Sequence, residues 1–392
     1  GDHRDLHRVD RRQRQMCIRD RNKIKNIKIY GAGSIGNHLA QACVRMGWRV
    51  DICDTDLDAL KRTKNDIYPA RYGEWNNNIG LYHVDDVPVG GYDMIIIGTP
   101  PDSHMPLALL AIKEGAKIVL VEKPLCKPNL DGAQELYNAA QKANCMVFVG
   151  YDHAISQSAK HIFNFLANKA VGNIQTIDVE FREYWGGIFA AHPWLNGPSD
   201  SYLGFWQRGG GACGEHSHAI NLWQNFAHSA EVGRVIEVNA NMEYVENDKV
   251  SYDSLCLMQI KTESGLIGRI VQDVITQPTR KWGRVQGDSG FIEWYCGKRP
   301  GIDEVIISEN NKEAKTIEIS KTRPDDFHEE MKHIDFVFNN KEKEYTHSPL
   351  SLEKGLETML VIAAAHLSAQ NKCSVAIDYS QGYAERALSL NN

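Results

Sequence analysis

The sequence lacks the features that mark several large classes of protein. Its 392 residues contain no apolar run near the roughly 20 residues that a membrane span needs. The nine cysteines form no CxxC pair and have no regular spacing, which indicates reduced thiols in a cytoplasmic protein. A net charge of −6 gives no electrostatic reason to expect nucleic acid or an anionic membrane surface as a partner. We therefore expect a cytoplasmic protein that binds neither nucleic acid nor membrane.

The N-terminal segment lacks the marks of a targeting signal. Residues 1–21 have no apolar core such as a secretory signal needs, and they carry acidic residues that a mitochondrial presequence avoids. The stretch RRQRQMCIRDR resembles translated sequencing-adapter read-through, so we interpret 1–21 as a disordered or non-native tail. The rest of the chain is long for one compact domain. We expect two, spanning residues 22–149 and 150–392.

The start of the first predicted domain has the pattern of a dinucleotide-binding unit. The apolar run at 27–30 predicts a strand, and the GAGSIG loop that follows opens an amphipathic helix. Gly31 permits the turn, Gly33 lets the backbone approach a pyrophosphate, and Gly36 allows close helix–strand packing. The free N–H groups of the helix would bind phosphate. With the loop residues Ser34 and Ile35, these glycines are the predicted cofactor contacts.

The acid that follows the second predicted strand favours NAD over NADP. Asp54 lies about 20 residues after the glycine loop, the spacing typical of a ribose-binding carboxylate. A carboxylate there accepts hydrogen bonds from the ribose hydroxyls and repels a 2′-phosphate.

Alternating apolar strands and helices continue to about residue 150. They predict a parallel sheet covered on both faces, with helices over 106–114 and 130–143. Such sheets bind ligands beyond the carboxyl ends of their strands. Three polar loops follow strands there and are expected to converge on one crevice: Thr99-Pro100 to His104, Glu122-Lys123, and Tyr151 to His153.

Five motifs in this order, GAGSIG, GTPPDSH, VEKPL, VGYDH and GGG…SH, resemble the Gfo/Idh/MocA oxidoreductases over about residues 24–390. The resemblance implies a Rossmann domain followed by an α+β domain with a large, mostly antiparallel open sheet, commonly used for oligomerisation. Later segments agree, because they read as strands between 174 and 296 and as helices near 327–339 and 351–370. A homodimer or homotetramer is expected, with Ile267, Ile270 and Val274 on the uncovered face.

The resemblance also implies site residues. The lysine of the family's EKP motif, which lies beside the nicotinamide and the substrate hydroxyl, corresponds to Lys123. Its acid/base histidine corresponds to His218. The aspartate expected four residues before that histidine corresponds to Gly214, and we interpret Glu215 as its replacement. Thr99, Pro100, His104 and Glu122 are predicted near the cofactor.

The segment GEHSH, residues 214–218, admits three interpretations. If it is one continuous helix, Glu215 and His218 share a face and His216 points away. A histidine with a near-neutral pKa then suits proton removal from an alcohol, with Glu215 orienting the ring. The Glu-x-x-His spacing recurs at Glu330 and His333, as in di-iron bundles, but the strand-rich chain between them argues against a metal. A structural polar patch is the third interpretation.

The predicted activity is hydride transfer between a nicotinamide cofactor and a secondary alcohol or ketone of a sugar, polyol or sugar derivative. Tyr151, His153, Trp185 and Trp206 are candidates to contact such a substrate, although core packing explains the tryptophans equally well. Two alternatives stay open: an NAD-retaining lyase or glycosidase, and a non-catalytic nucleotide and sugar sensor. The presence of both Lys123 and His218 argues against the sensor.

Overall fold

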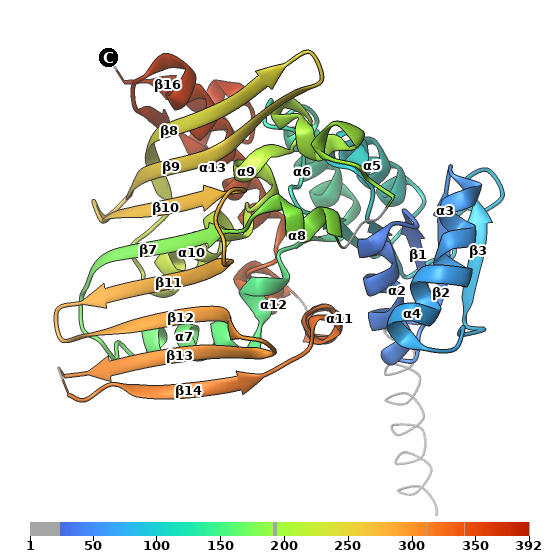
Figure 1. The fold of residues 1–392 in the computed structure, drawn as a ribbon, viewed down its shortest axis with the longest axis horizontal. Helices are drawn as coiled ribbons and strands as arrows, with labels where there is room; N and C mark the ends of the chain where they lie inside the picture. The colour runs from blue at the N-terminus through green and yellow to red at the C-terminus, as the bar shows by residue number, and fades with distance from the viewer. Residues whose placement is uncertain (1–23, 191–193, 311, 341, 392) are drawn as a thin grey trace, which may run out of the picture.

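The computed structural model describes residues 24–190, 194–310, 312–340 and 342–391. The predicted tail at 1–21 lies outside these residues. The described chain forms two sheets, one of six strands and one of ten strands, which follow each other along the sequence (Figure 1). In this described part no helix is long and apolar enough to cross a membrane.

The first sheet confirms the predicted Rossmann topology. Within the described residues its six strands are all parallel, in the order β3-β2-β1-β4-β5-β6, the doubly wound arrangement. The strands are β1 (Asn26–Tyr30), β2 (Arg49–Asp54), β3 (Ile79–His83), β4 (Met94–Ile97), β5 (Ile118–Glu122) and β6 (Met146–Gly150). The helices among them are α2 (Ser34–Arg45), α3 (Leu57–Arg62), α4 (Tyr68–Tyr72), α5 (His104–Lys113) and α6 (Ala133–Ala143).

The second sheet confirms the predicted open, mostly antiparallel architecture. Its ten described strands run in the order β14-β13-β12-β11-β7-β10-β9-β8-β15-β16, and the β7–β10 pair is parallel. The strands are β7 (Ile174–Arg182), β8 (Val235–Asn247), β9 (Val250–Thr262), β10 (Ile267–Asp273), β11 (Arg280–Gly287), β12 (Gly290–Arg299), β13 (Ile302–Glu309), β14 (Lys315–Ser320), β15 (Val375–Ile377) and β16 (Leu388–Leu390). The domain boundary at residue 149 stays a prediction.

Helices cover one face of this second sheet. Figure 1 shows α7 (Gln157–Ala167), α10 (His218–Ser229) and α13 (Leu352–Asn371) behind it, and all three pack on its strands. The short helices α8 (Trp185–Ala190) and α9 (Gly211–Glu215) lie at its edge near the Rossmann domain. Farther along the chain, α11 (Arg323–Asn340) packs against α2 of the Rossmann domain, and α12 (Glu342–His347) follows it. The chain thus returns to the first domain after completing most of the second.

The prediction for the uncovered face was wrong at two of three residues. Ile267 is 50% exposed, but Ile270 and Val274 are buried at 0% and 4%. Side chains alternate along a strand, so Ile270, three positions from Ile267, points to the opposite face. Val274 follows β10 and packs in a buried cluster with Trp185 and Leu203. A second exposed apolar side chain on this part of the sheet is Leu257 of β9, which pairs with Val271 and is 42% exposed.

Candidate active site

The glycine loop leaves space where a dinucleotide phosphate would bind. Gly31 has φ +105°, and an added Cβ there would lie 2.7 Å from the carbonyl oxygen of Gly98. At Gly36 a Cβ would lie 2.0 Å from the Gly31 carbonyl oxygen. Gly33, which precedes α2, would have no described atom within 4 Å of such a Cβ. The first N–H groups of α2 therefore face an open space suited to an anion.

Asp54 borders this loop at the end of β2. One carboxylate oxygen accepts a hydrogen bond from the backbone N–H of Ala32 at 2.7 Å, and the other accepts from Asp56 N–H at 2.9 Å. Both bonds hold the half-buried acid beside the phosphate space. Ser34 opens α2 with its hydroxyl 2.9 Å from Arg71 Nη1, and Ile35 is half-buried beside it.

In the loop after β4, only some of the residues predicted to contact the cofactor in the GTPPDSH motif are accessible to a ligand. Pro100 is exposed and Thr99 is half-buried. His104 is fully buried, with its ring nitrogens 3.0 Å from the Pro124 carbonyl oxygen and 2.7 Å from that of Thr99. His104 thus joins the β4 and β5 loops, and this position disagrees with its predicted contact to the cofactor.

Lys123 and Glu215 meet where the loop after β5 contacts the end of α9. The Lys123 ammonium lies 3.0 Å from a Glu215 carboxylate oxygen, and it donates a hydrogen bond to the Glu215 carbonyl oxygen at 3.0 Å. Tyr202 donates to the same carboxylate at 3.2 Å. Burial alone would raise the pKa of Glu215, but the Lys123 charge brings it below its ordinary value. The Glu215 carboxylate therefore stays ionised at neutral pH and pairs with Lys123.

The predicted continuous helix through GEHSH was wrong. Helix α9 ends at Glu215 and α10 begins at His218, with a turn between them. The argument that three residues place two side chains on one face holds only within a helix. Glu215 accordingly pairs with Lys123, and His216 is buried where the charges of Glu215 and Glu183 act on it.

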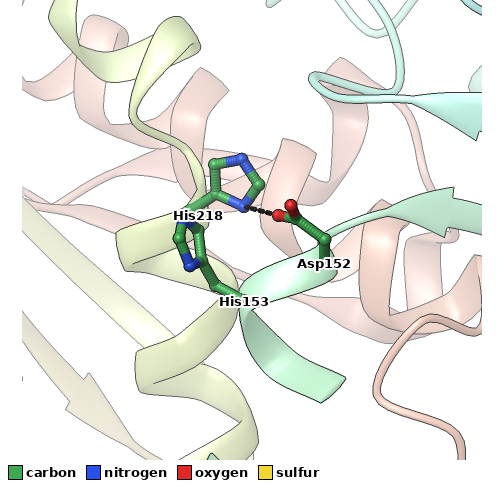
Figure 2. Close-up of side chains that lie close together, drawn as sticks. All are labelled: Asp152, His153 and His218. Atoms are coloured by element: carbon green, nitrogen blue, oxygen red, sulfur yellow. Dashed lines mark ion pairs between the residues drawn. The ribbon is translucent and has the colours of Figure 1, made fainter. Parts of the chain in front are cut away.

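The carboxylate closest to His218 comes from a residue that sequence reasoning missed. Asp152, in the 3₁₀ turn Asp152–Ile155 after β6, has Oδ1 3.7 Å from His218 Nδ1 (Figure 2). It lies inside the VGYDH motif, between the two residues chosen there as candidates. Its place at the carboxyl end of a parallel strand was the signal that could have found it.

Burial and cations keep the two site histidines neutral. Burial lowers the pKa of His218 well below the ordinary value, and the Lys123 charge lowers it further, while Asp152 opposes both effects. Burial likewise lowers the pKa of His153. Burial raises the pKa of Glu122 to about 8, and the nearby Asp152 charge adds to this shift. His218 is therefore neutral and has a free site for a proton, but its pKa lies below the near-neutral value expected from the sequence.

Tyr151 and His153 are buried and pack against the His218 ring. Tyr151 is fully buried, and its ring meets the His218 ring edge-on at 5.6 Å between centroids. His153 is 4% exposed and meets the same ring edge-on at 4.7 Å, with Nδ1 3.8 Å from Cys296 Sγ. The burial of Tyr151 disagrees with direct substrate contact.

The two tryptophans pack within the second domain. Trp185 is 5% exposed and stacks on Tyr252 at 4.5 Å between ring centroids. Trp206 stacks on His366 of α13 at 4.4 Å. Burial leaves Trp185 little surface for a sugar, which disagrees with its prediction. Trp206 is half-buried with one ring face on His366, and its contact with a sugar stays a prediction.

Within the described residues, Asp152, His153 and His218 also have donor types that a divalent cation accepts, and their ligand atoms lie within 4.8 Å of one another. However, the charges of Lys123, Lys281 and Arg323 all act on His218. Three cations facing the trio disfavour a fourth positive ion. The arrangement is better suited to moving a proton than to holding a metal.

Comparison with known proteins identifies the type of the first domain. Residues 25–151 match the Gfo/Idh/MocA family, an oxidoreductase family with an NAD-binding Rossmann fold. The Rossmann domain therefore has the NAD-binding fold of this family. The match confirms the predicted enzyme class, an oxidoreductase, and the predicted NAD cofactor. No curated protein sequence matches the chain.

Solved structures share the fold of this chain over both domains. An NAD-binding oxidoreductase from Klebsiella pneumoniae is 19% identical with a TM-score of 0.70, covering 90% of this chain and 98% of its own. The WlbA dehydrogenase from Bordetella pertussis, solved with NADH and UDP-GlcNAcA, is 18% identical with a TM-score of 0.66, covering 91% and 99%. Aldose–aldose oxidoreductase from Caulobacter crescentus, solved with glycerol, is 17% identical with a TM-score of 0.69, covering 91% and 100%.

Proposed function

We propose that this protein transfers a hydride between NAD and a secondary alcohol or ketone of a sugar, polyol or sugar derivative. The observation that carries the proposal is that Lys123 follows the carboxyl end of β5 and Asp152 that of β6, and that Asp152 Oδ1 lies 3.7 Å from His218 Nδ1. The Lys123 charge also acts on the His218 ring. The UDP-GlcNAcA bound to the similar WlbA dehydrogenase and the aldoses after which the similar Caulobacter crescentus oxidoreductase is named support the substrate class.

The residues at the glycine loop fit the cofactor. The open space at Gly33 and the first N–H groups of α2 would hold the pyrophosphate, and Asp54 would hold the adenosine ribose. When bound, NAD supplies the acceptor for the hydride that leaves the alcohol carbon.

The chain's own side chains would handle the oxygen and its proton. Lys123 would donate a hydrogen bond to the reacting oxygen and stabilise the negative charge that develops there. His218, held neutral by burial, would accept the hydroxyl proton as the C–H bond breaks. Glu215 would hold the Lys123 ammonium in place. This division of labour revises the predicted role of Glu215 as the support of His218.

A panel of polyols, aldoses and sugar acids, monitored at the nicotinamide absorbance, tests the proposal. We expect net NADH formation with at least one cyclic polyol or sugar, and a loss of about 10²–10⁴-fold in His218→Ala. Cleavage or elimination of a glycoside without net NADH would instead favour the NAD-retaining lyase or glycosidase. Binding of sugar and NAD without turnover would favour the sensor.

We also propose that the protein forms a homodimer or homotetramer through the uncovered face of the second sheet. Leu257 and Ile267 are exposed there, beside a hollow of about 530 Å³ that they help to line. A cytoplasmic setting is part of the same proposal, and the described cysteines, all free thiols, support it.

A further inference from the structure

We infer that Asp152 is a positioning residue for His218: it holds the ring with Nδ1–H toward its carboxylate, so that Nε2 exchanges the substrate proton. The inference rests on the proposed function and adds a group that neither the motifs nor the family description assigns. It also gives each of the two carboxylates at the site its own partner. Glu215 pairs with Lys123, which leaves Asp152 as the carboxylate for His218.

The geometry around Nδ1 carries the inference. Asp152 Oδ1 and His218 Nδ1 lie 3.7 Å apart, both are buried, and neither has a hydrogen-bond partner among the described residues. Figure 2 shows the carboxylate pointing at the ring nitrogen. An ionised carboxylate only accepts hydrogen bonds, so closer approach requires the proton on Nδ1. Catalytic hydrogen bonds are often long without ligand and shorten when substrate binds.

Arg323 holds Asp152 in place from the far side. This first residue of α11 donates from Nη1 to Asp152 Oδ2 at 3.2 Å. Its guanidinium also lies over the Phe327 ring at 4.7 Å. Burial would raise the pKa of Asp152, but His153 when it is protonated and the Arg323 guanidinium hold it below the ordinary value. The carboxylate therefore stays ionised, and its hydrogen bond with Arg323 at the start of α11 keeps it directed at His218.

Asp152 is also the group that favours proton uptake by His218. The charged groups whose fields reach the ring come from several elements: Lys123 after β5, Lys281 on β11, Arg323 on α11, and the neighbouring His153 and Asp152. The three cations oppose the imidazolium, as does a protonated His153, and Asp152 favours it. Removing its charge should lower the pKa of His218.

The test compares Asp152→Asn and Asp152→Glu with the wild type on one turned-over substrate. We expect Asp152→Asn to lower kcat by about 10²-fold or more, because the amide can donate to Nδ1 and shift the proton to Nε2. The acidic limb of the pH–rate profile should move to lower pH. Asp152→Glu should restore part of the rate. NAD affinity should be unchanged.

A matched control is Asp51→Asn, which alters another buried carboxylate, bonded to Tyr92 in the Rossmann domain. This variant should keep kcat and the pH profile. If Asp152→Asn also keeps both while Lys123→Met is inactive, the positioning role is refuted and the proposed function stands.

A second readout needs no substrate. The ¹⁵N NMR signals of His218, assigned with His218→Gln, should show the Nδ1–H tautomer in the wild type and a larger Nε2–H fraction in Asp152→Asn. An Nε2–H ring in the wild type would overturn the inference even if no substrate were turned over. A stoichiometric divalent metal in the wild type that is lost in Asp152→Asn and in His153→Gln would also overturn the inference. Asp152, His153 and His218 would then form a metal site.

Discussion

The Lys123 ammonium contacts Glu215 twice, through a carboxylate oxygen and through the backbone carbonyl oxygen, each at 3.0 Å, although 92 residues separate the pair. The contact joins the Rossmann loop after β5 to the end of helix α9 in the second domain. It sets the position of the one cation that the proposed mechanism needs at the reacting oxygen.

Lys123→Met should abolish turnover and leave NAD affinity largely intact. The substitution removes the charge that polarises the substrate oxygen but keeps a side chain of similar length. Steady-state rates and calorimetry with NAD check this. Lys127→Met is the matched control, because Lys127 follows on the same loop and pairs with Asp131 at 3.6 Å. It should keep its activity; an active Lys123→Met would contradict the assigned role.

Glu215→Gln should lower kcat by about ten- to a hundredfold, equivalent to ~1.4–2.7 kcal/mol of barrier. The amide retains a hydrogen-bond acceptor for Lys123 but loses the charge. Because Glu215 supports Lys123, the acidic limb assigned to His218 should move less than in Asp152→Asn. The two pH–rate profiles, measured on one substrate, make the comparison. A larger shift in Glu215→Gln would restore the pairing of Glu215 with His218.

NAD should bind more tightly than NADP, and Asp54→Asn should narrow the difference. The Asp54 carboxylate would repel a 2′-phosphate, whereas asparagine has the same shape without the charge. Its side-chain oxygen can still accept one of the two backbone N–H bonds that hold Asp54. Asp54→Ser should narrow the preference as well. Calorimetry with both cofactors decides, and tighter NADP binding by the wild type would refute the prediction.

The pair Leu257→Lys and Ile267→Lys, made together, should yield monomers. Placing two charges on the exposed sheet face disfavours burial of that face against a second copy. Light scattering should give a dimer or tetramer mass for the wild type and the monomer mass for the double variant. Val89→Lys changes an exposed apolar residue, 84% exposed, in the Rossmann domain and should leave the assembly intact. A monomeric wild type would reject the interface.

Stability should fall as the pH drops from about 6.5 toward 4. Burial lowers the pKa of His216 and His333 to about 4 and that of His366 to about 3. In this window the unfolded chain binds protons that the folded chain does not, so stability rises with pH. His366→Gln should therefore show a shallower loss of Tm on acidification than the wild type. The exposed His347→Gln should follow the wild-type slope, and equal slopes for all three proteins would contradict the cause.

The Rossmann domain could be predicted from the sequence because the patterns that specify it lie within short stretches of the chain. A buried parallel strand reads as a continuous apolar run, and the glycines that the turn requires occur within six residues. The same logic placed Lys123 and Tyr151 to His153 at strand ends that meet at one edge. For the second sheet, the sequence predicted strands, but it did not predict that Ile270 and Val274 are buried.

Tertiary structure decided which side chains meet. The sequence alone determined a Rossmann domain, an open sheet, and Lys123, Glu215 and His218 as the chemical groups to examine. It did not determine that the chain turns between Glu215 and His218, because that break depends on the packing of α9 mainly on β9 and of α10 mainly on β7. Once the helix breaks there, Glu215 reaches Lys123, and His218 reaches Asp152, which lies 66 residues earlier in the chain. Periodicity reports neighbours within one element, whereas contacts between elements depend on how the two domains pack together.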